Sequence, residues 1–148
     1  MRKLTTLKIK NHKLQNENKS LQMLTCYDFQ SAQMLNETEV DFLLVGDSLG
    51  NVMLGYDTTV PVRLEEMKIF SAAVKRGAPN KFIVADLPFG TYSTVEQGIQ
   101  SATELFQYSQ VESVKLEGAF PYQLELIQRL TQIGIPVMGH IGLTPQSV

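Results

Sequence analysis

Residues 82–90 read FIVADLPFG, a near-continuous apolar run in which Asp86 is the one acidic residue. Four other short apolar runs lie along the chain, at residues 21–26, 42–46, 111–116 and 135–139. Such runs are typical of parallel strands covered on both faces, although periodicity alone does not separate them from buried helical segments. The pattern predicts a parallel sheet of five strands, with residues 82–87 as the third.

Helix-like segments separate these runs. Apolar residues recur at helical intervals over residues 29–36 and 64–76, and Gly77 is predicted as the left-handed residue that ends the second segment. Ser93 to Glu96 fits a capping box that opens a helix running to about Ser109. A further helix is expected from Pro121 to Ile133. Strand and helix in alternation indicate right-handed βαβ units, in either an open doubly wound sheet or a closed (β/α)8 barrel.

Composition excludes several classes of protein. The chain has 148 residues, a formal net charge of −2 and no run of Lys or Arg, so nothing favours nucleic acid or a membrane surface as a partner. The polar residues 1–19 lack the apolar centre of a signal peptide, and we expect a cytoplasmic protein.

Cysteine and histidine are scarce. Cys26 is the single cysteine, and His12 and His140 are the two histidines. A disulfide within the chain is excluded, and a zinc site built from Cys and His is improbable. Any bound metal is therefore expected to take oxygen ligands.

Polar residues follow the apolar runs at equivalent places. The residues concerned are Asp47 and Ser48 after the second run, Asp86 in the third, Lys115 and Glu117 in the fourth, and His140 after the fifth. In a barrel the carboxyl ends of parallel strands meet at one mouth, where active sites are built. Three carboxylates gathered there repel one another unless a cation neutralises them, and oxygen ligands suit Mg²⁺.

Each of these residues also has an ordinary structural interpretation. Asp47 is placed as a helix N-cap or turn residue would be. Lys115 and Glu117 are two residues apart on one side of a strand, where they would form an ion pair. His140 alone would more often be a hydrogen-bonded structural histidine. The recurrence of polar residues on successive strands is what favours a functional site.

The loop from Gly46 to Gly50 invites comparison with nucleotide-binding loops. It contains neither GxGxxG nor GxxxxGK[ST], so the dinucleotide-binding and P-loop interpretations are discarded.

Several stretches resemble the ketopantoate hydroxymethyltransferase family. They are MLTCYD (23–28), LLVGDSLGNVMLGYDTT (43–59), AVKRG (73–77), VADLPFGTY (84–92), VKLEG (114–118) and GIPVMGHIGLTPQSV (134–148). They occur in the family's order and cover nearly everything from residue 20 onward.

The resemblance implies a (β/α)8 TIM barrel related to phosphoenolpyruvate mutase and isocitrate lyase. Residues 20–148 would be the N-terminal part of one barrel domain, stopping after about five strands, since a complete barrel takes roughly 250 residues. Residues 1–19 are expected to form a helix that packs outside the barrel or at a subunit interface. The family assembles as a homo-oligomeric ring, which implies a decamer for the complete protein.

The implied activity is that of an enzyme, a hydroxymethyltransferase. It transfers a one-carbon unit from 5,10-methylenetetrahydrofolate to 3-methyl-2-oxobutanoate, through an enolate stabilised by one Mg²⁺ per subunit. The product is 2-dehydropantoate, in the first step of pantothenate biosynthesis.

The resemblance also assigns residues to this reaction. By similarity, Asp47, Asp86 and Glu117 correspond to the metal ligands, and Asp47, Ser48, Asp86 and Lys115 to the residues that contact the oxo acid. His140 resembles a pocket residue. The family's catalytic glutamate falls beyond Val148, so no catalytic residue is expected within the chain.

Two alternatives remain open. The first is a related Mg²⁺-dependent oxo-acid lyase or mutase, although the lyase branch carries a KKCGH-like loop that this sequence lacks. The second is a catalytically inactive, truncated remnant. We expect the polypeptide alone to be poorly soluble or to need a complementing fragment, and to turn over little substrate.

Overall fold

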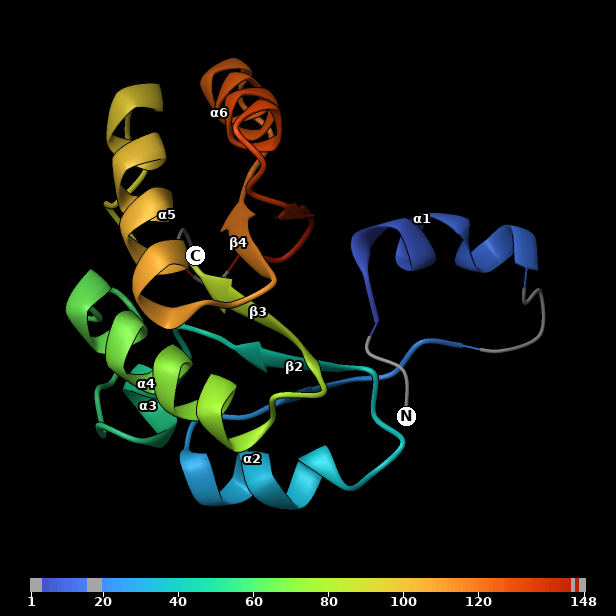
Figure 1. Ribbon diagram of the computed structural model, residues 1–148. Helices are drawn as coiled ribbons and strands as arrows, with labels where there is room; N and C mark the ends of the chain where they lie inside the picture. Colours follow the sequence, from blue (N-terminus) through green and yellow to red (C-terminus); the bar gives the residue numbers. More distant parts are fainter. Residues whose placement is uncertain (1–3, 16–19, 145, 147–148) are drawn as a thin grey trace.

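The computed structural model describes residues 4–15, 20–144 and 146 and contains one parallel sheet (Figure 1). Its strands lie in the order β1-β2-β3-β4-β5, each parallel to its neighbour. They are β1 (Met23–Thr25), β2 (Phe42–Val45), β3 (Phe82–Asp86), β4 (Ser113–Glu117) and β5 (Val137–His140). All five predicted strands are therefore present, and sequential neighbours pair as right-handed βαβ units require.

Most of the described helices lie on one face of this sheet. The helices are α1 (Thr6–Gln15), α2 (Phe29–Asn36), α3 (Leu49–Val52), α4 (Leu64–Gly77), α5 (Val95–Ser109) and α6 (Pro121–Gln132). In sequence order, α2 packs on α4, α4 on α5 and α5 on α6, which makes a layer along the sheet. Figure 1 shows α1 on the opposite side of the sheet from α4 and α5. We call the face that this helix layer leaves uncovered the inner face.

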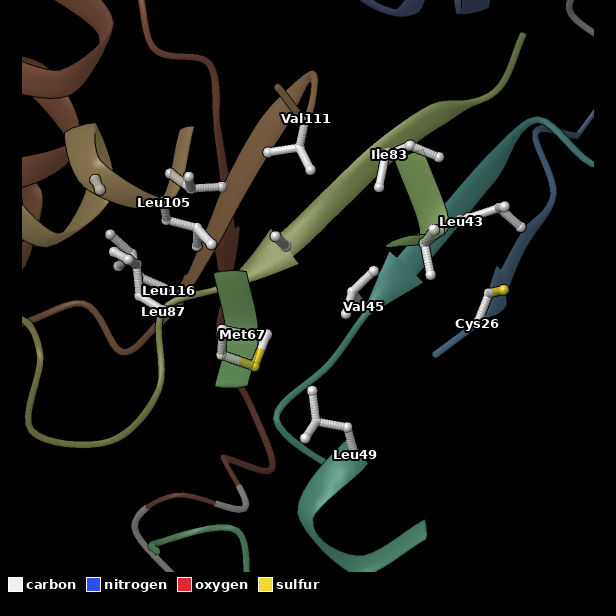
Figure 2. Packing of buried hydrophobic residues seen from close by; sticks show 14 of the residues in the cluster. Cys26, Leu43, Val45, Leu49, Met67, Ile83, Leu87, Leu105, Val111 and Leu116 are labelled. Atoms are coloured by element: carbon white, nitrogen blue, oxygen red, sulfur yellow. The ribbon is translucent and has the colours of Figure 1, made fainter. Parts of the chain in front are cut away.

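The main core fills the space between sheet and helix layer. Leu43 and Val45 of β2 and Ile83 of β3 are fully buried there. Figure 2 shows them gathered with Met67 of α4 and Leu105 of α5. Because side chains alternate along a strand, the neighbouring residues of β2 and β3 must point to the inner face.

A second, smaller cluster lies on the inner face. Phe42, Phe82 and Val84 are buried in it, and Ile9 of α1 packs against them. The rings of Phe42 and Phe82 meet edge to face with centroids 5.2 Å apart, a favoured aromatic geometry. Residues 6–15 of the polar N-terminal segment thus form a helix that contacts the inner face, while a role for it at a subunit interface stays a prediction.

Two local predictions need correction. The N-cap of α5 is Thr94, whose hydroxyl accepts from the main-chain N–H of Gln97 at 3.2 Å, so the predicted capping box of Ser93 and Glu96 is wrong. Gly77 is the last residue of α4 and does not adopt the left-handed conformation. A Cβ on Gly77 would lie 2.5 Å from the carbonyl oxygen of Phe29, so this glycine instead allows α4 to approach α2.

No helix in the described part of the chain is both long enough and apolar enough to cross a membrane.

Gly98 permits a close crossing of α5 and α6. A Cβ at this position would lie 2.3 Å from Cδ2 of Leu126, a fully buried side chain of α6. Replacing a helical Gly with Ala gains about 1 kcal/mol in helix propensity, but overpacking a core costs about 1–3 kcal/mol. Because Leu126 is enclosed, we expect overpacking to outweigh the gain in propensity.

We therefore predict that Gly98→Ala lowers the free energy of unfolding, as measured by urea denaturation. Leu126→Ala alone should destabilise by about 2–5 kcal/mol through the cavity it leaves. In the double variant the added methyl group occupies part of that cavity. The double variant should therefore lose less free energy of unfolding than the two single variants lose together. A more stable Gly98→Ala protein, or strictly additive losses, would contradict this account of the crossing.

Candidate active site

The candidate site is the inner face at the carboxyl ends of β3, β4 and β5. Asp86 lies beside Lys115 in the β3–β4 register, and Glu117 lies beside His140 in the β4–β5 register. Asp86 and Val84 are two residues apart, so they share the inner face. The predicted convergence of strand-end polar residues is therefore observed.

Lys115 joins two of the three carboxylates. Its Nζ lies 2.6 Å from Oδ1 of Asp86 and 3.5 Å from Oε1 of Glu117. All three side chains are buried, with residue exposures of 9%, 3% and 5% in the order just given. A buried carboxylate without a partner is costly, so this cation makes the burial of Asp86 tolerable.

Asp47 reaches the same cluster from the loop after β2. Its main-chain N–H donates to Oδ2 of Asp86 at 3.2 Å, and its side chain is buried. A Cβ on Gly46 would lie 2.9 Å from Oγ of Ser48 and 3.4 Å from Oδ2 of Asp86. The absence of a side chain at Gly46 is thus what lets this loop and the end of β3 approach each other.

The charge of the cluster is not balanced by its own residues. Three carboxylates face one ammonium group, which leaves two negative charges if all of them are ionised. Burial raises the pKa of Asp86 to about 6, although the nearby Lys115 charge acts in the opposite direction. Burial also raises the pKa of Asp47, against a hydrogen bond from Gln146 that lowers it. Both shifts show a site that favours less negative charge or an additional cation.

Ser48 and His140 stand at the edge of the cluster. The hydroxyls of Ser48 and Tyr27 lie 2.8 Å apart and share a hydrogen bond, which ties the end of β1 to the loop after β2. Nδ1 of His140 lies 3.1 Å from Oε1 of Glu117, and the histidine side chain is 35% exposed. The structure thus brings all six predicted site residues to one edge of the sheet.

Three further residues of the cluster were missed by the sequence analysis. The Tyr92 hydroxyl and the Gln146 side chain are buried beside Glu117 and Asp47, and burial raises the pKa of Tyr92 to about 12. A cavity of about 90 Å³ adjoins Tyr92, Glu117 and Gln146. Tyr27 is the third. Each lies in a stretch already quoted for its resemblance to the family, and that was the only available signal.

The donor set can be tested against a magnesium ion. Among residues 4–15, 20–144 and 146, no three His, Cys, Asp or Glu side chains lie close enough together to hold a metal ion. The main chain of Asp47 nonetheless contacts the Asp86 carboxylate, and the Asp47 charge helps to raise the pKa of Asp86, so the two side chains are near each other. Two carboxylates with water or substrate completing the shell suit Mg²⁺. The buried hydroxyl of Thr59 has no hydrogen-bond partner in the described residues. The residues therefore fit a hard cation held by Asp47 and Asp86.

Solved structures show the fold to which this arrangement belongs. 2,3-Dimethylmalate lyase, a member of the PEP mutase/isocitrate lyase superfamily, aligns with a TM-score of 0.68 at 17% identity over 93% of this chain and 53% of its own. Phosphoenolpyruvate phosphomutase from Streptomyces platensis subsp. rosaceus aligns with a TM-score of 0.73 at 9% identity, over 93% of this chain and 54% of its own. At these identities the likeness concerns fold alone. It confirms the predicted barrel type, of which the described residues form five strands.

Curated relatives are much more similar to this chain in sequence than these solved structures are. The 3-methyl-2-oxobutanoate hydroxymethyltransferase of Leptospira interrogans is 55% identical over 86% of this chain and 49% of its own length. The enzyme of that name from Thermosipho africanus is 52% identical over 92% of this chain and 51% of its own. The chain thus spans about half the length of the curated relatives it matches. A family model described as ketopantoate hydroxymethyltransferase matches residues 3–148, and the chain belongs to that family.

Proposed function

We propose that the protein containing this chain transfers a hydroxymethyl group from 5,10-methylenetetrahydrofolate to 3-methyl-2-oxobutanoate, giving 2-dehydropantoate for pantothenate biosynthesis. The observation that carries the proposal is the buried cluster of Asp47, Asp86, Lys115 and Glu117 in a chain of this family. Within the same proposal, the complete protein is a cytoplasmic homo-oligomer, with the ring of ten subunits that the resemblance implies.

Asp47 and Asp86 are the residues that would hold Mg²⁺, with Glu117 as the third member proposed from the family resemblance. When bound, the ion supplies Lewis-acid stabilisation of the negative charge that develops on the oxo acid as its C3 proton is removed. The two aspartates are held in place without the ion, because the main chain of Asp47 donates to Asp86. That pre-organisation lowers the cost of gathering like charges at one point.

Lys115 and Ser48 would bind and orient the oxo acid. The Lys115 ammonium is buried at the strand end, where a charge-assisted hydrogen bond to a substrate carboxylate is strengthened by the low local dielectric. The Ser48 hydroxyl is oriented by its hydrogen bond with Tyr27. Two fixed contacts on one side of a small substrate define which face of its enolate is open to attack.

A lyase or mutase function has weaker support. The two solved structures of that group named above are 17% and 9% identical to this chain, whereas the two relatives that are 55% and 52% identical carry the name of a hydroxymethyltransferase. The second alternative, a catalytically inactive remnant, is separated from the proposal by turnover: the protein containing this chain should form 2-dehydropantoate from 3-methyl-2-oxobutanoate, whereas a remnant should not.

Metal binding is the first test. Asp47→Asn and Asp86→Asn should each weaken Mg²⁺ binding, measured by isothermal titration calorimetry, by about 100-fold or more, because even second-shell partners cost about 10–100-fold. Asp57→Asn is the matched control, since Asp57 lies on the exposed part of the loop before α4. Unchanged affinity in either site variant would contradict the proposed metal position.

Binding of the oxo acid is the second test. Lys115→Met keeps the approximate length of the side chain and removes its charge. The affinity for 3-methyl-2-oxobutanoate should then fall by about 10–100-fold, because a hydrogen bond to a charged group contributes about 1.5–3 kcal/mol. Lys68→Met is the control, because Lys68 pairs with Glu104 away from the site. Equal affinity in the Lys115→Met and unsubstituted proteins would show that Lys115 does not bind the substrate.

The pH dependence follows from the raised pKa of Asp86. The native pKa of about 6 exceeds the value of about 3.9 expected in the unfolded chain. Between pH values of about 3.9 and about 6, the native state therefore binds more protons at Asp86 than the unfolded chain does. The stability that protonated Asp86 contributes is lost as the pH rises through about 6.

We predict a ¹³C NMR midpoint near pH 6 for the Asp86 carboxyl. Asp28 is the internal reference, because hydrogen bonds from Ser31 lower its pKa. Since Mg²⁺ requires the deprotonated form, its affinity should rise as pH increases through about 6. An affinity that stays constant across that range would exclude Asp86 as a ligand.

A further inference from the structure

Gln146 contacts three members of the site, Asp47, Tyr92 and Glu117. Its side-chain Nε2 donates to Oδ2 of Asp47 at 2.8 Å and to the carbonyl oxygen of Leu87 at 3.0 Å. Its Oε1 accepts from the Tyr92 hydroxyl, and its main-chain N–H donates to Oε2 of Glu117 at 3.3 Å. The residue is 5% exposed, so these bonds form away from bulk water.

The chemistry of these partners fixes the orientation of the amide. The carbonyl of Leu87 and the carboxylate of Asp47 only accept hydrogen bonds, so the NH₂ group must face them. Rotating the amide by half a turn would place its oxygen against two other oxygens. The Tyr92 hydroxyl occupies the remaining side as a donor. Gln146 therefore presents a fixed donor to one oxygen of Asp47.

This donor contacts a different carboxylate from the two with which Lys115 pairs. The Lys115 ammonium contacts Asp86 and Glu117, whereas the carboxylate of Asp47 receives the amide of Gln146. Because an amide is neutral, it orients Asp47 without cancelling its charge. The Asp47 carboxylate thus keeps the charge that a cation ligand needs and loses rotational freedom.

We propose that Gln146 is a positioning residue that fixes the Asp47 carboxylate, and through its main chain that of Glu117, in the orientation used to hold the divalent cation. The inference rests on the proposed function, since it assigns Gln146 a part in the same site. Gln146 acts through the two carboxylates and takes no part in the chemical step.

Gln123 provides a matched control. It is also a glutamine, it is also 5% exposed, and it also contacts Glu117. Its Nε2 donates to the carbonyl oxygen of Glu117 at 2.8 Å, and its Oε1 accepts from the N–H of Phe120 at 2.9 Å. These bonds join main-chain atoms to one another through Gln123, so its loss should affect stability without turning a carboxylate.

The experiment compares Gln146→Met with Gln123→Met in the full chain. Methionine keeps the approximate volume of glutamine and removes the amide, so both variants should have a lower Tm. The Kd for Mg²⁺, measured by isothermal titration calorimetry, should rise by about 10–100-fold in Gln146→Met, as for other lost second-shell partners, and should change by less than about twofold in Gln123→Met. An unchanged Kd in Gln146→Met would overturn the positioning role and leave the proposed function standing.

Crystal structures of the two variants give a readout that does not depend on metal. The Asp47 carboxylate should be rotated in Gln146→Met and unmoved in Gln123→Met; an unmoved carboxylate in both would overturn the inference. If the unsubstituted chain binds neither Mg²⁺ nor the oxo acid, the proposed function fails and these structures alone decide the positioning role.

Tyr92→Phe covers the case in which Gln146→Met does not fold. It removes the hydroxyl that holds Oε1 of Gln146 and should raise the Kd for Mg²⁺ by several-fold. No change in this variant would overturn the inference.

Discussion

The buried contact between Lys115 and Asp86 is the interaction on which the site depends. Asp86 has 3% of its surface exposed, and without a partner its charged form would be strongly disfavoured by the cost of desolvation. The ammonium of Lys115, 2.6 Å away, offsets that cost and also approaches Glu117. Burial outweighs this contact, so the pKa of Asp86 is still raised to about 6. A site in this state responds strongly to any additional positive charge.

The parallel sheet is what makes such a contact possible. Strands that run in one direction bring their carboxyl ends to one edge, and the register places Asp86 beside Lys115 and Glu117 beside His140. The helix layer covers the other face, so the alternation of side chains sends apolar residues to the helices and polar residues to the mouth. The same alternation gives the inner face its apolar cluster further from the mouth, around Phe42 and Phe82.

Much of this arrangement was predictable from sequence, because it depends on local patterns. Apolar runs located all five strands, and α2 has the predicted bounds. Capping was less predictable, since Ser93 and Thr94 are both competent N-caps and only the packed helix selects Thr94. The conformation of Gly77 was also beyond reach, because it is set by contact with Phe29 of another helix. Gln146 was missed because its bond to Asp47 spans 99 residues, and a glutamine carries no local signal of such a contact.

The inner face has chemically opposite ends, and this polarity bears on how a solute would travel. Towards the amino ends of the strands a cavity of about 270 Å³ is lined mainly by apolar residues, among them Ile9, Phe42, Phe82 and Met138. Transfer of an ion into such surroundings is strongly opposed by the loss of its hydration shell. A charged solute is therefore expected to approach the site from the carboxyl ends of the strands, where the polar residues lie. His140, whose side chain is 35% exposed, lies at that end of the sheet and so puts a polar group within reach of such a solute.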